Sequence, residues 1–202
     1  IDLSKFTDRK LTFSAGVVVA HWKAPLGEVL SWARKMEGEA KDIDENKDAF
    51  ALAVLKHSGE IHKTIYKWRY DGNWTMDLLK ELIDRIKGTA KEQINSGTNP
   101  LRQEFSNNFI KTLNQEFQKI MDEDGNLYED SLIKSEIKRL LRRSCLLWKK
   151  PGETFKEFEL RKKLTVQSLQ ERLETLYTCS KNFQNFLSAL NIADFLAREV
   201  EE

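Results

Sequence analysis

The sequence has 202 residues, enough for one large domain or for a small α/β unit joined to a helical one. Its 33 basic residues nearly balance its 32 acidic ones, and the net charge of +1 gives no global field that would favour nucleic acid or a membrane. The two cysteines, Cys145 and Cys179, lie far apart without the C-x-x-C spacing of a zinc site, and they do not suggest a disulfide framework. We therefore expect a cytoplasmic protein without a membrane span. Any preference for nucleic acid or for a membrane must come from a local cluster of charges.

The first predicted elements are a strand, a helix and a second strand. Residues 10–22 contain a run of three valines, which predicts a mostly buried strand. Pro25 then stops strand pairing and suits the first turn of a helix. Up to Lys41, apolar residues recur at helical spacing, namely Leu26, Val29, Leu30, Ala33, Met36 and Ala40. The run AFALAVLKHSG, which starts at residue 49, predicts a second buried strand, and residues 61–70 predict either an edge strand or a ribbon that faces a partner.

Runs of β-branched residues disappear after the turn formed by Asp71, Gly72 and Asn73, and helical periodicity continues to the end of the chain. We expect helices at residues 75–95, 100–121, 131–149, 154–177 and 181–198, separated by ordinary turn residues. The sequence therefore predicts an α+β fold with two domains, 1–72 and 73–202, of which the second is a helical bundle.

Three segments resemble a known family. SAGVVVAHWKAPLGEVLSWARKMEGEAKD and the later KDAFALAVLKHSGE are similar to the second palm domain of the large, polymerase/cyclase-like subunit of type III-B (Cmr-type) CRISPR effector complexes, a domain related to GGDEF nucleotide cyclases. The closing NFLSALNIADFLAREVEE resembles the end of that subunit's C-terminal helical domain. The resemblance implies that residues 1–72 form part of a ferredoxin-like palm and that residues 73–202 form the helical domain.

The paired-aspartate GGDD motif of that family does not occur in these residues. Two-metal nucleotidyl transfer needs carboxylates that hold both cations at the reacting phosphates, so we expect no catalytic residue and no catalysis from this chain alone. In the family the motif precedes the SAG strand, so the chain resembles a C-terminal piece of a longer protein or one half of a split subunit. The sheet would then expose an apolar edge and face that the rest of the palm would cover.

Ser14, Ala15 and Gly16 form the first candidate site. From the residues alone, such a triplet favours tight packing where a bulkier side chain would clash with a helix. The resemblance implies instead that the Ser14 hydroxyl and a close backbone approach at Gly16 meet a nucleotide. Both interpretations stay open at this point.

Lys41 and His21 are the other nucleotide-binding candidates. A lysine at the end of a helix interacts favourably with the helix dipole, whereas related cyclases and palms place a lysine there to meet nucleotide phosphates. Lys47 is a weaker candidate for the same role. His21 resembles a histidine at this place in the family, where it borders the nucleotide pocket, although a capping or packing role is an equal alternative. His57 and His62 lack a completing Cys or carboxylate, so we expect no metal site.

Residues 134–163 include eleven basic residues against four acidic ones, with apolar residues between them. A basic helical face can bind phosphate backbones, but it can equally be a solvated surface or meet an acidic neighbouring subunit. The best candidates for contacts with RNA or a partner are Lys138, Arg139, Arg142 and Arg143.

The resemblance also implies a function. The complete subunit binds ATP with Mg or Mn, is similar to subunits that make cyclic oligoadenylates once target RNA is recognised, and assembles with other Cmr-type subunits, crRNA and target RNA. This chain would supply one wall of the ATP pocket and a docking surface for small subunits or RNA, and would hold no cofactor by itself. The alternatives are a scaffold module of a ribonucleoprotein without a nucleotide role, and a degenerate GGDEF-like nucleotide sensor.

Overall fold

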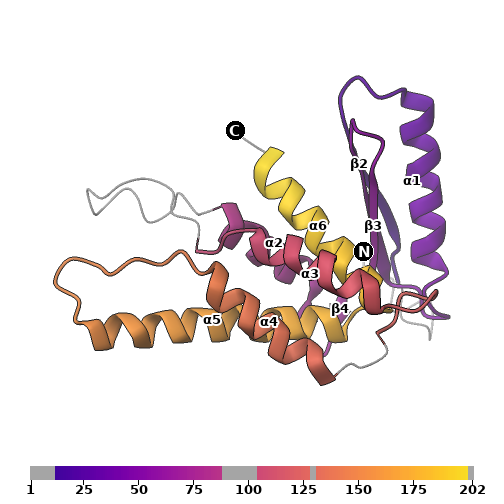
Figure 1. Cartoon of the computed structure of the whole chain (residues 1–202). Coiled ribbons are helices and arrows are strands. Elements are labelled where there is room, and N and C mark those ends of the chain that lie inside the picture. Colours follow the sequence, from indigo (N-terminus) through magenta and orange to yellow (C-terminus); the bar gives the residue numbers. More distant parts are fainter. Residues whose placement is uncertain (1–11, 88–103, 128–130, 200–202) are drawn as a thin grey trace, which may run out of the picture. The chain divides into compact units, whose positions relative to one another are not determined.

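The computed structural model describes residues 12–87, 104–127 and 131–199 (Figure 1). The chain divides into two compact units, Ile1–Gly72 and Asn73–Glu202. The first holds a three-stranded sheet with one helix, and the described part of the second consists mainly of helices. The predicted α+β fold, with a small palm-like unit followed by a helical region, is confirmed.

The first unit is a strand–helix–strand crossover followed by a hairpin. Its elements are β1 (Ala15–Ala20), α1 (Leu26–Lys41), β2 (Ala49–Leu55) and β3 (Ile61–Lys67). The sheet has the order β1-β2-β3, in which β1 and β2 are parallel and β3 runs antiparallel to β2. Because α1 connects two parallel strands, it runs back along the sheet, so its C-terminal end lies at the end where β1 begins.

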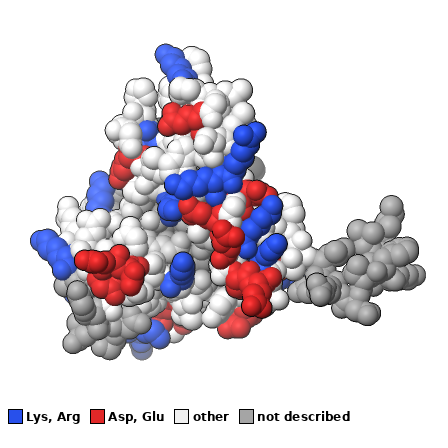
Figure 2. Space-filling view, turned by 90° about the vertical axis from the view of Figure 1, so that its right-hand side faces the viewer, with Lys and Arg blue, Asp and Glu red and all other residues white. Residues whose placement is uncertain are grey.

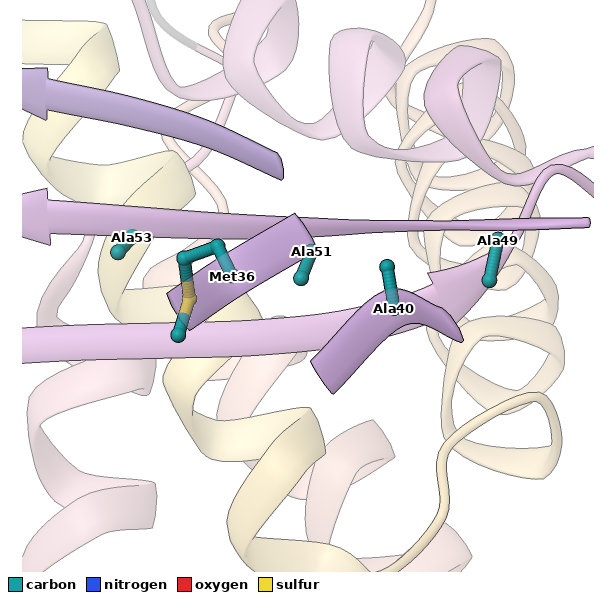
Figure 3. Close-up of a cluster of buried hydrophobic side chains, with 5 residues drawn as sticks. All are labelled: Met36, Ala40, Ala49, Ala51 and Ala53. Carbon is teal, nitrogen blue, oxygen red and sulfur yellow. The ribbon is translucent and has the colours of Figure 1, made fainter. Parts of the chain in front are cut away.

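Small side chains let α1 lie close to the sheet. Met36 and Ala40 of α1 point toward Ala49, Ala51 and Ala53 of β2, and all five are fully buried (Figure 3). The three alanines alternate along β2, so they share the face of the sheet that α1 covers. Alanine at these positions leaves room for the helix backbone, which fixes the position of α1 over β1 and β2.

The prediction that residues 10–22 form a mostly buried strand is wrong in its extent and its burial. β1 is shorter and lies at one edge of the described sheet, with only β2 beside it, and Val17 is exposed. The first turns of α1 are also less buried than their spacing predicts, since Leu26 is 71% exposed and Leu30 is 47% exposed. The two differences have different causes. An edge strand gives α1 no surface to cover beyond it, whereas Val17 lies on the face of the sheet away from α1, because Gly16 and Val18 face the helix.

The helical unit contains longer elements and a larger core. Two short strands, β4 (Arg69–Tyr70) and β5 (Asn73–Trp74), flank the turn at which the first unit ends. The helices that follow are α2 (Thr75–Lys87), α3 (Asn108–Phe117), the 3-10 helix η3 (Gln118–Ile120), α4 (Ser131–Ser144), α5 (Phe155–Thr178) and α6 (Phe183–Glu199). Phe183 and Phe186 of α6 pack with Tyr177 and Phe117, and α6 supplies many of the buried side chains of this unit. None of the described helices is long and apolar enough to span a membrane.

Two predicted helix boundaries are wrong because of a contact between distant segments. The helix predicted at 131–149 ends at Ser144, and the one predicted at 100–121 starts at Asn108, with residues 100–103 outside the described part. Phe105 and Cys145 pair as an isolated antiparallel bridge instead. The flanking backbone groups exchange hydrogen bonds, from the Ser106 amide to the Ser144 carbonyl and from the Leu146 amide to a carbonyl before Phe105, each at 2.8 Å. These bonds replace the helical ones that both segments give up.

Candidate nucleotide site at the start of the first strand

Gly16 packs directly against the backbone of α1. A Cβ atom at this position would lie 2.5 Å from the Ala33 carbonyl oxygen and 2.9 Å from the Glu37 Cα. No side chain can be added there without moving helix backbone, so glycine is required for the contact between β1 and α1. Tight packing against α1 therefore accounts for the glycine at position 16, and the side of Gly16 that faces α1 leaves no room for a ligand.

Ser14 lies just before β1, two residues from Gly16, and Ala15 is the first residue of the strand, beside Phe50 of β2. The Ser14 hydroxyl oxygen is buried and has no hydrogen-bond partner among the described residues. A buried hydroxyl without a partner is costly, and such a group is often satisfied by a ligand or by a neighbouring chain. Ser14 is therefore the member of the triplet that has hydrogen-bonding capacity to offer.

Lys41 is the last residue of α1 and lies at the same end of the unit as Ser14 and Gly16. It forms an ion pair with Glu37, which in turn lies against Gly16, and both side chains of the pair are about half exposed. A pair this exposed contributes only about 0–1 kcal/mol to stability, so little holds the Lys41 ammonium in place against a competing anion. The structure thus brings Ser14, Gly16 and Lys41 together at one end of the sheet.

His21 lies at the opposite end of β1 and is not brought together with these residues. Its ring lies 5.2 Å from the ring of His57, and its Nδ1 atom accepts a hydrogen bond of 3.3 Å from the Lys23 amide. His62 has a different environment, because its Nε2 atom lies 2.9 Å from a carboxylate oxygen of Glu60. Burial lowers the pKa of His62 below its ordinary value, although Glu60 partly opposes this effect. The structure gives His21 a turn-stabilising contact and places it away from Lys41.

The described residues contain no group of three or more His, Cys, Asp or Glu side chains that could hold a metal ion. Besides the Ser14 hydroxyl and the Lys41 ammonium, this end of the unit holds the Glu37 carboxylate, which is paired with Lys41. A carboxylate already paired with a lysine is a poor fit to a divalent cation, which prefers several oxygen ligands. The ammonium and the hydroxyl fit an anionic or hydrogen-bonding group of a nucleotide better.

The basic residues proposed on α4 have different environments. The Nε atom of Arg139 donates a 2.7 Å hydrogen bond to the Glu136 carboxylate, and the Arg139 guanidinium lies 3.4 Å from the Glu116 carboxylate. The hydrogen bonding to Glu136 raises the pKa of Arg139 above its ordinary value. Lys138, Arg142 and Arg143 are exposed. On the face drawn in Figure 2, basic and acidic side chains lie next to one another. The structure therefore leaves three of these four residues exposed for a partner, and engages Arg139 within the unit.

An exposed apolar surface lies at the start of α1, at the opposite end of the helix from Lys41. Leu26, Leu30 and Ala33 follow one another at intervals of four and three residues, so the three share one face of α1, and Ala33 lies over β1. The two exposed leucines therefore lie on the side of α1 nearest the β1 edge. The helical spacing of both leucines predicts that they lie on the covered face of α1, and this prediction is wrong. The signal that could have placed them otherwise is their position in the first turns, above a strand that has one neighbour in the described sheet.

Comparisons with known proteins point to one family. Residues 2–51 match the family model described as the second palm domain of Cas10/Cmr2. The chain is also 31% identical over 83 residues to the CRISPR system Cmr subunit Cmr2 of Pyrococcus furiosus. That match covers 40% of this chain and 9% of the relative, so the chain spans a small part of that protein's length. These matches confirm the resemblance to a Cmr2-like large subunit that the sequence predicts, and they support a large subunit of type III CRISPR systems as the coarse functional class. The family match includes Ser14, Ala15, Gly16, His21 and Lys41.

Proposed function

We propose that this chain supplies one wall of an ATP-binding palm in the large subunit of a crRNA-guided type III-B CRISPR complex, together with a docking surface for other subunits or RNA. The observation that carries the proposal is the arrangement around Gly16 within the segment that matches the Cas10/Cmr2 second palm. The packing of Gly16 fixes α1 over β1 and keeps Lys41 at the same end of the sheet as the Ser14 hydroxyl, which has no hydrogen-bond partner among the described residues.

The proposed roles of the two residues differ. Lys41 exchanges its exposed partner Glu37 for a nucleotide phosphate, and a hydrogen bond to a charged group is worth about 1.5–3 kcal/mol. Ser14 offers its buried hydroxyl to a neutral polar atom of the nucleotide, a weaker interaction of about 0.5–1.5 kcal/mol. Metal ligands and catalytic carboxylates come from a GGDD-bearing palm segment outside these residues, and with them comes the capacity to make cyclic oligoadenylates.

The free side of β1 is the proposed place where that segment joins. Apolar side chains are exposed on both faces of the sheet beside β1, the leucines at positions 26 and 30 of α1 on one face and Val17 on the other. Among the described residues the outer edge of β1 is unpaired. Edge strands of this kind pair readily with further backbone, and burying the surface would add stability. The rest of the palm is therefore expected to complete both the sheet and the nucleotide site.

The test is ATP affinity of the assembled particle, measured by equilibrium dialysis for the wild type, Lys41→Met and Ser14→Ala. We expect Lys41→Met to weaken ATP binding by about tenfold or more and Ser14→Ala to weaken it by a smaller factor. Arg34→Met is the matched control, because Arg34 is an exposed cation on the same helix and should have no effect. Unchanged affinity in both site variants would contradict the proposed ATP role.

A scaffold module without a nucleotide role is the second candidate, and the packing of Gly16 favours it, since the glycine is already explained by its contact with α1. The same dialysis separates the two candidates, because a scaffold should show no ATP binding that depends on Lys41. Tighter binding of GTP than of ATP would instead favour a GGDEF-like nucleotide sensor.

A further inference from the structure

Two histidines from turns far apart in the sequence meet at one end of the first unit. His21 follows β1 by one residue, and His57 follows β2 by two. Because β1 and β2 are parallel and Ala20 lies beside Leu55, both histidines lie at the end where these strands finish. Figure 1 shows the turn before α1 and the hairpin turn after β2 at this end of the unit. The ring centroids of His21 and His57 are 5.2 Å apart, and both residues are exposed.

Backbone hydrogen bonds hold both turns. The Ala24 amide donates a 2.8 Å hydrogen bond to the His21 carbonyl. In the hairpin turn, the Gly59 amide donates to the Lys56 carbonyl and the Lys56 amide donates to the Glu60 carbonyl, each at 3.0 Å. The backbone therefore fixes where each imidazole starts, and rotation of two exposed side chains is enough to aim one nitrogen of each ring at a shared ligand.

The spacing of the two rings suits a shared metal ion. Zinc–nitrogen distances of about 2.0–2.1 Å place the centroid of a bound imidazole about 3.2 Å from the metal. Two rings bound at a tetrahedral angle then have centroids about 5 Å apart, in agreement with the 5.2 Å between His21 and His57. Imidazole nitrogen suits Zn²⁺, Cu²⁺ and Ni²⁺, whereas Mg²⁺ and Ca²⁺ prefer oxygen ligands.

The positive charges beside the pair are partly offset. Lys56, which precedes His57, forms a 2.7 Å ion pair with Glu60. The Lys23 ammonium lies over the ring of Trp22, 4.9 Å from its centroid. Each lysine therefore has a negative or electron-rich partner of its own, which lowers the repulsion that a bound cation would meet.

Metal binding requires a small rearrangement at His21. Its Nδ1 atom accepts a 3.3 Å hydrogen bond from the Lys23 amide, so in the neutral ring the proton is on Nε2. A metal at Nε2 moves this proton to Nδ1 and breaks the bond to the amide, whereas a metal at Nδ1 replaces that bond directly. In both cases the ring stays neutral, and one long hydrogen bond is exchanged for a metal–nitrogen bond.

We propose that His21 and His57 form a two-histidine site for a late first-row divalent cation of the Zn²⁺ and Cu²⁺ class. The described residues add no third His, Cys, Asp or Glu side chain to the pair, so water fills the other coordination positions. The bound cation links the turn before α1 to the turn between β2 and β3. The site lies at the end of β1 opposite Ser14 and does not depend on the proposed ATP role.

The test is the Cu²⁺ and Zn²⁺ affinity of the intact chain without an affinity tag, measured by titration calorimetry. Two ligands that act together bind far more tightly than either alone, so His21→Gln and His57→Gln should each weaken Cu²⁺ binding roughly tenfold or more. His62→Gln is the matched control, because His62 is the remaining histidine of the chain and lies beside Glu60. Circular dichroism checks that each variant folds, and Mg²⁺ should not compete for the site.

Trp22 provides a second readout that locates the bound ion. Its ring lies 5.8 Å from the ring of His21, and the residue is 82% exposed. Bound Cu²⁺ should quench the fluorescence of this tryptophan, so the quenching should diminish in Trp22→Phe and need more Cu²⁺ in both site variants. Zn²⁺ should also slow hydrogen exchange in the two turns, residues 21–24 and 56–60, more than elsewhere in the unit.

The outcomes separate a shared site from chance binding. Weaker binding in both site variants, with unchanged binding in His62→Gln, supports the proposal. Affinity that survives His57→Gln or His21→Gln would show an adventitious ion on one imidazole only and would overturn it. The absence of saturable Cu²⁺ binding to the wild type would also overturn it, and would mean that the two rings only contact each other.

Discussion

The carbonyl oxygen of Ala33 in α1 would lie 2.5 Å from a Cβ atom at position 16 of β1, so Gly16 is the residue that allows helix and strand to meet. This contact explains why a glycine stands in the apolar run of an otherwise β-branched strand. It also fixes the end of α1 that carries Lys41. The position of Lys41 in the candidate nucleotide site therefore depends on the packing of Gly16 against α1.

Replacing Gly16 by Ala is expected to destabilise the protein. The added methyl group meets helix backbone, which cannot move aside as a flexible side chain can, and overpacking of this kind typically costs about 1–3 kcal/mol. Urea unfolding followed by circular dichroism would measure the change. Gly38→Ala is the matched control, because a Cβ at position 38 meets nothing within 4 Å, and Ala in a helix interior should stabilise by about 0.5–1 kcal/mol. Equal stability of the two variants would contradict the packing account of Gly16.

The elements that the sequence predicts well are those whose stability comes from neighbours along the chain. α1 begins beside Pro25 and ends at Lys41, as the helical spacing indicates, and β2 lies within the predicted apolar run. The capping residue Thr154 likewise stands where a helix was predicted to begin. Local chemistry is enough to set these boundaries.

The errors arise where contacts between distant residues decide. α4 ends at Ser144 because its carbonyl accepts from the Ser106 amide, a partner that helical periodicity cannot reveal. Leu26 and Leu30 are exposed because β1 is an edge strand of the described sheet, although their spacing is that of a covered face. At the candidate site, Lys41 lies near Ser14 because α1 connects two parallel strands and ends where β1 begins. His21 lies away from both residues because it follows the other end of β1.

Asn114 of α3 and Asn191 of α6 exchange side-chain hydrogen bonds of 2.9 and 3.1 Å in a partly buried position. Asn191→Ala should destabilise the helical unit by about 1–3 kcal/mol, because it leaves the Asn114 amide without this partner. The double variant with Asn114→Ala should cost less than the sum of the single variants, with a coupling of about 0.5–3 kcal/mol. Strictly additive costs in denaturant unfolding would show that the two amides do not interact.

The N-terminal cap of α5 should contribute measurably to stability. Thr154→Ala removes the hydroxyl of the capping box, which accepts a hydrogen bond from the Glu157 amide and donates one to the Glu157 carboxylate, and it should cost about 0.5–2 kcal/mol. Hydrogen exchange should also speed up at the first turn of α5 more than at its buried second half. Thr165→Ala, in the interior of the same helix, is the control and should change stability little. If exchange at the first turn is the same in both variants, the box does not hold this end of the helix.

The ion pair that braces α5 should have a distinct pH dependence. Hydrogen bonds from Arg161, and then from the Lys150 amide, lower the pKa of Glu153 from 4.5 to about 2. Because the pKa is lower in the folded protein, the stabilising contribution is complete above pH 4.5 and is lost as the pH falls through about 2. Carbon-detected NMR titration should find the Glu153 midpoint near 2, and Arg161→Gln should raise it.

Glu157 provides the internal control for that titration, since its pKa is lowered by Thr154 and not by Arg161. Its midpoint should stay low in Arg161→Gln. A wild-type Glu153 midpoint near 4.5 would mean that the brace is absent in solution.

The measurement that tests the central claim most directly is the native mass and composition of the particle that contains this chain, purified from its own cells. The account predicts that a GGDD motif is present in the same native polypeptide or in a chain bound to it in equal amount, and that ATP binding requires both that segment and Lys41. A stable, monodisperse chain without such a segment would contradict the account, because the edge of β1 and the exposed leucines of α1 would then need no further palm to cover them.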